Sequence, residues 1–119
     1  MVDDGSDDAR IALPQGALEL LVLRTLARGD AHGYAIAQAV QRASREALAL
    51  EEGSLYPALH RLERRGWARA KWGVTDTGRR AKFYGLSAAG KKRLEREQRT
   101  WERMTRAVGL VLRERAGEA

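Results

Sequence analysis

Apolar residues along this chain recur with the period of a helix in four stretches and alternate with polar residues in two shorter ones. In residues 51–65, Leu55, Leu59 and Leu62 lie at positions i, i+4 and i+7, which places them in one stripe of a helix. The opposite face is polar and basic, and it consists of Pro57, His60, Arg61 and Arg64. This division is typical of a helix that enters a DNA groove, and also of many ordinary solvated helices.

Pro57 limits where this helix can begin, because a proline is tolerated in the first turn, where backbone amides lack intrahelical partners. We therefore expect the helix to start near Gly53 or Ser54, with Ser54 as its N-cap, and to end at Gly66. The free amides and partial positive charge of its first turn suit a phosphate group.

The first helix is expected to begin near Pro14 and to run to Leu26, with apolar residues around most of its circumference. A helix of this kind is buried on more than one side. One face can pack on its own domain, and the remainder, with Leu18 and Leu21, suggests a partner subunit. Gly29 is expected to end this helix.

A second amphipathic helix is expected from His32 or Gly33 to about Arg45, with His32 in a structural role at its start. Residues 48–50 fit either a linker or a brief strand.

Residues 67–72 and 81–86 alternate between apolar and polar side chains, which predicts two β-strands. The residues between them are rich in turn formers, so we expect a β-hairpin with a long, basic and flexible tip. Its glycines and short polar residues permit close backbone approach, and its cations suit phosphate contacts. These cations are Arg79, Arg80 and Lys82.

Ser87 is expected to cap a long, charged helix that runs to about Arg115. Its apolar residues recur at spacings of three, four and seven and form a single seam, which indicates a helix–helix contact. The seam consists of Leu94, Trp101, Met104, Val108, Val111 and Leu112.

Composition narrows the classes of function. The 119 residues suit one domain with an appended helix, and 22 Lys and Arg against 16 Asp and Glu give a net charge of +6. A basic surface attracts nucleic acid or anionic membrane, but no apolar run approaches the length of a spanning helix. The acidic N-terminus lacks the apolar core of a signal peptide, which predicts a cytoplasmic protein.

The residue types and motifs in the sequence argue against an enzyme. The chain has no cysteine and two histidines, which gives little support to a metal site. Glycine-rich phosphate loops, paired carboxylates and Ser/His/Asp spacings do not rise above chance. We expect neither an enzyme nor a bound cofactor.

Three helices followed by a hairpin is the order of elements in a winged helix-turn-helix. There the third helix reads the major groove of DNA, and the hairpin, or wing, lies along the backbone or minor groove. We expect a mainly α protein with a small β-hairpin wing and a long C-terminal dimerisation helix. The expected divisions are a disordered acidic tail (1–12), a winged helix-turn-helix domain (13–87) and the C-terminal helix (88–119).

Five motifs occur along the chain: Leu13-Pro14-Gln15-Gly16, His32-Gly33-Tyr34, Glu52-Gly53-Ser54-Leu55-Tyr56-Pro57-Ala58-Leu59, Leu62-Glu63 with Gly66-Trp67, and Lys82-Phe83-Tyr84-Gly85-Leu86-Ser87-Ala88-Ala89-Gly90. Their order and spacing resemble the PadR family of bacterial transcriptional regulators. The resemblance covers roughly residues 13–112 and is most similar to short, acidobacterial-type members.

The resemblance implies a homodimer, in which the C-terminal helix packs against the partner together with the first helix. It also implies a repressor of a dyad-symmetric operator in double-stranded DNA. The family pattern places DNA contacts at Ser54, Tyr56, Pro57, His60 and Arg61 of the third helix, and at Lys71 and Arg79 to Lys82 of the wing. Arg64 joins them because arginine can grip a guanine edge with two bonds or neutralise a phosphate.

Several alternatives stay open. Tyr56 could instead pack at the flank of the helix, and His60 could simply cover the surface. Trp101 could be dimer core, or, as in some PadR-like proteins, it could line a pore between subunits and stack on a flat aromatic effector beside Met104. A winged helix used only for protein–protein contact, without an operator, is the alternative function. Activation of transcription, in place of repression, also stays open.

Overall fold

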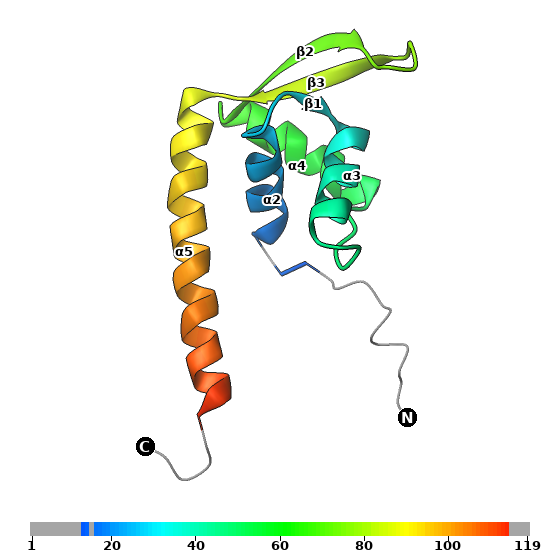
Figure 1. Ribbon diagram of the computed structural model, residues 1–119. Helices are drawn as coiled ribbons and strands as arrows, with labels where there is room; N and C mark the ends of the chain where they lie inside the picture. The colour runs from blue at the N-terminus through cyan, green and yellow to red at the C-terminus, as the bar shows by residue number, and fades with distance from the viewer. Residues whose placement is uncertain (1–12, 15, 115–119) are drawn as a thin grey trace.

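A bundle of three short helices lies under a small antiparallel sheet, and one long helix stands beside both (Figure 1). The computed structural model describes residues 13, 14 and 16–114, so the expected tail at 1–12 and the chain after 114 lie outside the described residues. The helices are α2 (Ala17–Leu26), α3 (Gly33–Ala43), α4 (Glu52–Arg64) and α5 (Ala88–Arg113). The strands are β1 (Ala31–His32), β2 (Ala68–Val74) and β3 (Arg80–Leu86). The predicted fold class, mainly α with a small β wing, is confirmed.

The apolar stripe of α4 forms the centre of the core, as its spacing predicts. Leu55, Leu59 and Leu62 are at most 1% exposed and belong to one buried cluster with side chains of α2 and α3, such as Leu23 and Ile36. Full burial of a leucine stabilises a fold by about 1.5–3 kcal/mol relative to exposure. This stripe therefore fixes which face of α4 points outward.

The start of α4 differs from the prediction. The helix begins at Glu52, its N-cap Glu51 makes no side-chain capping bond, and Ser54 lies inside the first turn. Pro57 is therefore one turn deeper than expected. Its missing amide leaves the carbonyl of Gly53 without the usual intrahelical donor, and because Gly53 is exposed, water can hydrate that carbonyl.

The predicted hairpin is confirmed, and it carries a third strand that the sequence did not indicate. Strand β3 pairs with β2 along its length and with the two-residue β1 on its other side. Residues 48–50 form neither helix nor strand. His32 ends β1 and caps α3, because its Nδ1 accepts the amide of Ala35 at 3.4 Å. Helix α2 starts at Ala17, later than its proline suggested.

Helix α5 docks on the corner between α4 and β2 through backbone contacts. Ser87 caps α5 by accepting the amide of Gly90 at 3.0 Å, as predicted, and its hydroxyl also donates to the carbonyl of Gly66 at 2.6 Å. The amide of Ser87 donates to the carbonyl of Trp67 at 3.1 Å. The Trp67 ring lies near the guanidinium groups of Arg65 and Arg93. This corner sets the direction in which α5 leaves the domain.

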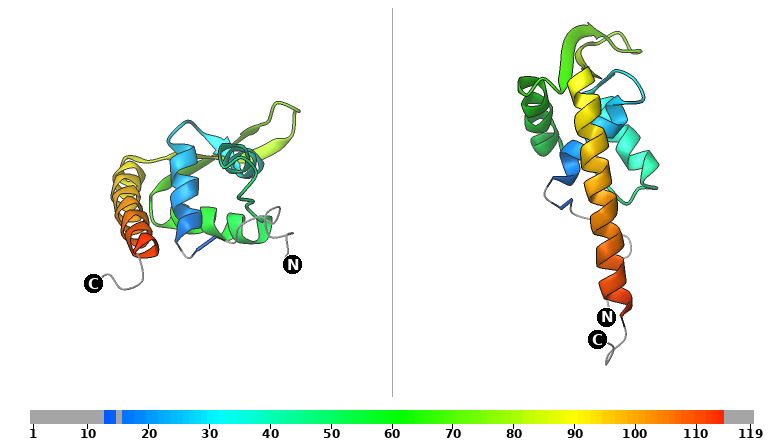
Figure 2. Two further views of the ribbon diagram at one scale, coloured as in Figure 1. Left: turned by 60° about the horizontal axis from the view of Figure 1, so that its bottom comes forward. Right: turned by 90° about the vertical axis from the view of Figure 1, so that its left-hand side faces the viewer.

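The N-terminal half of α5 packs on α2, and its C-terminal half extends beyond the three-helix bundle (Figure 2). Leu94 is 5% exposed and belongs to the core cluster of its own chain. At 1.5 Å per residue, the 26 residues of α5 span roughly 39 Å. None of the helices in the described ranges is long and apolar enough to cross a membrane.

Replacing Gly90 with alanine tests the corner. A β-carbon at Gly90 would overlap the carbonyl oxygen of Trp67, which belongs to the backbone and cannot move aside alone. We expect Gly90→Ala to lower the free energy of unfolding by about 1–3 kcal/mol, measured by urea denaturation with circular dichroism at fixed protein concentration.

Gly53→Ala is the matched control, because a β-carbon there meets nothing within 4 Å. Alanine favours an α-helix over glycine, so this change should stabilise the protein by about 0.5–1 kcal/mol. Equal effects of the two substitutions would contradict the close approach at Gly90.

Candidate nucleic-acid interface

The outward face of α4 is a row of exposed residues whose helical spacing aligns them. Gly53, Pro57, His60 and Arg64 lie opposite the buried stripe, and all four are exposed. The first two have no long side chain, so a partner can come close to the helix backbone there. The last two supply hydrogen-bonding and cationic groups toward the C-terminal end. We call these four residues the outer row.

One flank of α4 is held by an ion pair to α2. Arg61 donates from Nε to Oε2 of Glu19 at 2.9 Å, and Arg65 donates from Nη1 to Oε1 of the same carboxylate at 3.3 Å. Arg61 was predicted as part of the free face, and the structure places it at the flank with 38% of its side chain exposed. The partners are 42 positions apart along the chain, so no local pattern signals the pair.

The other flank of α4 packs on the start of α3. The ring of Tyr56 lies so near Gly33 that a β-carbon at position 33 would come within 2.7 Å of it, so a larger residue there would displace the ring. Tyr56 is nevertheless 47% exposed. The packing alternative for Tyr56 is thus what the structure shows, while enough surface is left for a partner.

Lys82 ties the wing to α4. Its Nζ lies 3.1 Å from Oε1 of Glu63, and it also lies 5.7 Å from the centre of the Tyr84 ring. The hydrogen bond to Glu63 raises the pKa of Lys82 above its ordinary value of 10.5. Burial raises the pKa of Tyr84 above 10.0. The structure therefore places Lys82 beside the helix and not at the tip of the wing.

The tip of the wing is a closed turn. The Thr75 amide donates to the carbonyl of Arg79 at 2.8 Å, and the Gly78 amide donates to the carbonyl of Thr75 at 2.9 Å. The Thr75 hydroxyl accepts the amide of Arg79 at 3.1 Å and lies 3.1 Å from the hydroxyl of Thr77. These bonds define the shape of the tip, and its expected flexibility stays a prediction.

A groove runs between the wing and the starts of α3 and α4. It brings together four of the predicted contact residues and two exposed aromatic residues that the sequence did not single out as contacts. The six are Tyr56, Arg79, Arg80, Lys82, Tyr34 and Trp72.

Both of these aromatic residues, Tyr34 and Trp72, are well exposed. Trp72 is 59% exposed and lies two residues before the end of β2, and the guanidinium of Arg80 lies 4.9 Å from its ring centre. Its place at the end of the predicted strand 67–72 was the available signal in the sequence. Lys71 and Ser54, both predicted contacts, are exposed and do not line this groove.

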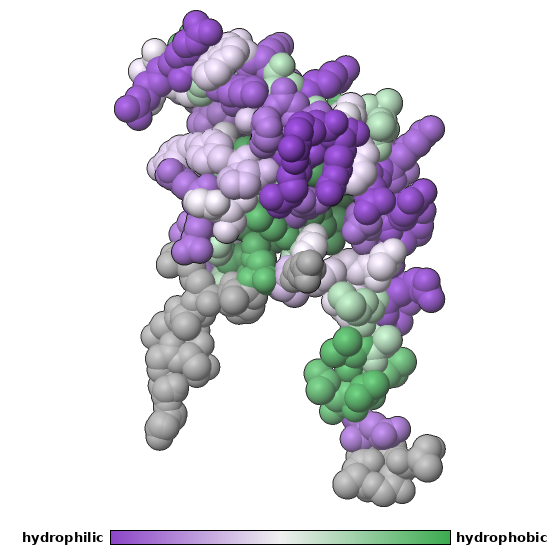
Figure 3. Space-filling view, turned by 180° about the vertical axis from the view of Figure 1, so that it is seen from behind, coloured by the Kyte–Doolittle hydropathy of each residue, from purple (hydrophilic) through white to green (hydrophobic). Residues whose placement is uncertain are grey.

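The C-terminal half of α5 exposes apolar side chains, which gather near the end of the helix in Figure 3. Four residues of the predicted seam are exposed there: Met104, Val108, Val111 and Leu112. Leu110 is also exposed and was absent from the predicted seam, because it lies on another side of the helix. Apolar residues thus surround most of this segment.

The other predicted dimer residues are partly or wholly covered within one chain. Leu18, Leu21 and Trp101 are half-buried. Leu94 is in the core, so little of its side chain is left for a partner.

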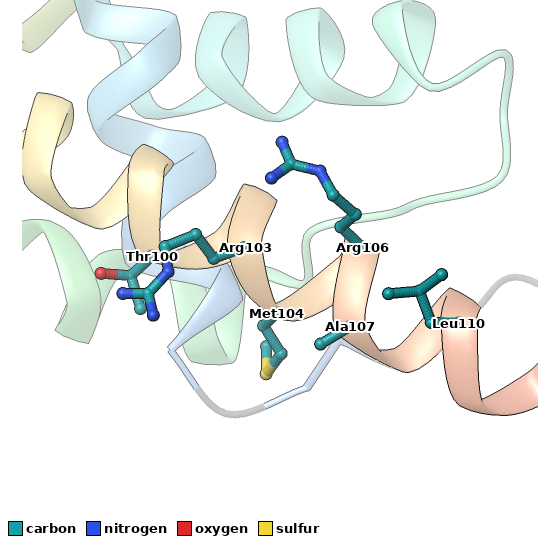
Figure 4. A pocket seen from close by; sticks show the side chains of 6 residues that line it. All are labelled: Thr100, Arg103, Met104, Arg106, Ala107 and Leu110. Carbon is teal, nitrogen blue, oxygen red and sulfur yellow. The ribbon is translucent and has the colours of Figure 1, made fainter. Parts of the chain in front are cut away.

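A shallow pocket lies along α5, and all of its lining residues belong to that helix (Figure 4). They are Thr100, Arg103, Met104, Arg106, Ala107 and Leu110. Of the two predicted effector residues, Met104 lines this pocket and Trp101 does not. Within the described ranges, no group of three or more histidine and acidic side chains is arranged to hold a metal ion.

Known proteins share this arrangement. The model of the PadR-like transcriptional regulator family matches residues 22–96. A transcriptional regulator of Mycobacterium tuberculosis is 34% identical over 94 residues, which cover 79% of this chain and 84% of that protein.

Solved structures agree. A transcriptional regulator from Clostridium thermocellum superposes with a TM-score of 0.72 at 26% identity, covering 80% of this chain and 92% of that one. A PadR family transcription regulator from hypervirulent Clostridium difficile gives a TM-score of 0.68 at 29% identity, with coverages of 82% and 99%. These proteins are transcriptional regulators and not enzymes. With its motifs, its winged helix and these relatives together, the chain belongs to the PadR-like family of transcriptional regulators.

Proposed function

We propose that this regulator is a sequence-specific repressor that binds double-stranded DNA as a homodimer on a dyad-symmetric operator. The observation that carries the proposal is the outer row of α4, which is exposed and ends in a cation while both flanks of the helix are fixed. A rigid helix with a slim, polar outer face fits the major groove, where side chains reach base edges.

The wing supplies the second contact. Arg79 and Arg80 follow the closed turn, and both are exposed. Their guanidinium groups suit phosphate oxygens, and they position the protein without reading sequence. Lys71, exposed on β2, is a further phosphate ligand in this proposal. Binding of this kind releases counterions and therefore weakens steeply with added salt.

The end of α5 supplies the partner surface. Its apolar residues are exposed in a single chain, and contiguous exposed apolar surface marks an interaction site. A second copy of α5 covers it in the proposed dimer, with Leu18 and Leu21 of α2 at the margin. The two α4 helices then enter successive major grooves about 34 Å apart, and occupancy blocks transcription in the cytoplasm.

A flat aromatic effector at Trp101 and Met104 is part of the same proposal; the family resemblance supports it at both residues, and the pocket along α5 supports it at Met104 alone. The acidobacterial-type subgroup stays a prediction from the motifs.

Substitutions on α4 and substitutions on the wing should change DNA binding in different ways. We expect Arg61→Ala and Arg64→Ala to weaken operator binding more than binding to random duplex, by roughly 1–3 kcal/mol. We expect Arg79→Ala and Arg80→Ala to weaken both, and each to flatten the plot of log affinity against log salt by about 0.9. Fluorescence anisotropy over a salt series measures both quantities.

Arg96→Ala is the matched control, because it removes the same charge from an exposed position on α5. The operator duplex is found by selecting sequences from a random pool with the wild-type protein, and by footprinting the DNA upstream of its own gene. Unchanged affinity in all four variants would refute the assigned DNA face. A wild-type protein that shows no salt-dependent DNA binding would instead favour the protein–protein interaction module.

The dimer surface has its own test. Val108→Glu and Val111→Glu each place a charge in the apolar end of α5, and desolvating an unpaired charge is strongly unfavourable. We expect both variants to sediment as monomers and to lose most of their operator affinity. Lys92→Glu, at an exposed polar position of the same helix, should stay dimeric. A wild-type protein that sediments as a monomer at micromolar concentration would contradict the dimer.

A further inference from the structure

A chain of four side chains joins the C-terminal end of α4 to α2 and returns to the flank of α4. It begins at Trp67, whose ring centre lies 5.2 Å from the guanidinium of Arg65. Arg65 donates to one oxygen of Glu19, and the other oxygen of Glu19 accepts from Arg61. Arg61 is the last member of this chain, at the flank of α4 next to the outer row.

Glu19 is itself held in place. It lies in the first turn of α2, near Ala17, which is 4% exposed, and its own side chain is only 24% exposed. Both of its carboxylate oxygens are engaged by different arginines, so neither the carboxylate nor its partners can turn freely. The carboxylate therefore has a fixed position relative to α4.

The bond to Arg61 uses Nε. A guanidinium group has five N–H donors in a rigid plane, and a bond through Nε leaves its outer edge, with the two Nη atoms, for another acceptor. That edge is the one that grips the O6 and N7 atoms of guanine with two parallel bonds. Fixing Nε thus fixes the plane in which the outer edge points.

Stability alone is a weak reason for this cluster. The side chains of Arg61 and Arg65 are 38% and 50% exposed, and exposed ion pairs contribute little to the free energy of folding. The cluster also lowers the net charge of a surface that is proposed to meet phosphate. An acidic residue beside the DNA-facing helix is explained if it orients the arginine side chain to which it is bonded.

We infer that Glu19 is a positioning residue that orients Arg61 for base recognition, so that α2 contributes to sequence specificity without touching DNA. This inference rests on the proposed function. It assigns Glu19 a role in specificity, and the readout is the ratio of affinities for operator and random duplex. Loss of an oriented two-bond contact to guanine should lower that ratio roughly tenfold.

The experiment compares Glu19→Ala with the wild-type protein on two duplexes: the one selected from a random pool, and a shuffled duplex of equal composition. We expect operator affinity to fall roughly tenfold and shuffled-duplex affinity to stay within about twofold. Glu95→Ala, which removes the same charge from an exposed site on α5, should leave both affinities unchanged. Glu19→Gln provides a second variant if Glu19→Ala unfolds, because the amide keeps one acceptor oxygen.

A double-mutant cycle separates positioning from other effects. Arg61→Lys keeps the charge but replaces the planar fork with a point charge, so it should lower the specificity ratio by itself. In that background, Glu19→Ala should change the ratio by less than about twofold, because its effect passes through the guanidinium.

Three results overturn parts of this account, and they are distinguishable. A specificity ratio that survives Glu19→Ala overturns the inference and leaves the proposed function standing. An undiminished effect of Glu19→Ala in the Arg61→Lys background overturns it as well, because the effect then bypasses Arg61. A wild-type protein that prefers no duplex overturns the proposed function and the inference with it.

Discussion

The contact between the start of α5 and the backbone of Trp67 determines how α5 is oriented relative to the rest of the domain. Gly90 admits the carbonyl of Trp67 where any larger residue would collide with it, and the hydroxyl of Ser87 bonds on both sides of the corner. The approach of Gly90 to the carbonyl of Trp67 involves backbone on both sides, so no change of rotamer can relieve it. The direction of α5 is therefore set relative to α4, and in the proposed dimer this direction sets how far apart two copies of α4 lie.

Different kinds of force hold α4 on its different sides. Hydrophobic burial of the leucine stripe fixes its inner face, and the steric fit of Tyr56 on Gly33 fixes one flank. Charged pairs, at Glu19 and at Lys82, act where the helix meets water. The apolar contacts give most of the stability, whereas the charged pairs at the surface mainly define orientation. The outer row is thus exposed without being loose.

Much of this fold could be predicted, because regular spacing of apolar residues reflects a local geometry that the sequence carries directly. The hairpin, the long helix and the cap at Ser87 follow from such patterns. Strand β1 could not be predicted from such a pattern, because two residues are too few to show an alternation. The predicted start of α4 was wrong, because residues 52–54 are helical although all three are exposed, and neither Pro57 nor the apolar spacing signals this earlier turn.

The candidate site, like the fold, could be predicted in part. Exposure of the outer row follows from helical period, but the partners of Arg61 and Lys82 lie far along the chain and depend on the tertiary fold. The close contact between Gly33 and the ring of Tyr56 also joins residues far apart in the sequence, so no local pattern indicates it. Several of the proposed contact residues were predicted from the family resemblance. The resemblance carries information about the tertiary fold that the spacing of residues alone does not contain.

The closed turn at the tip of the wing has a thermodynamic consequence. A loop that is already ordered by the Thr75 hydroxyl loses little conformational entropy when it meets a partner, so more of the contact energy appears as affinity. The same rigidity removes adaptability. A wing of fixed shape binds well only to a surface of complementary shape. A partner of different shape makes fewer contacts with it than it would make with a flexible loop.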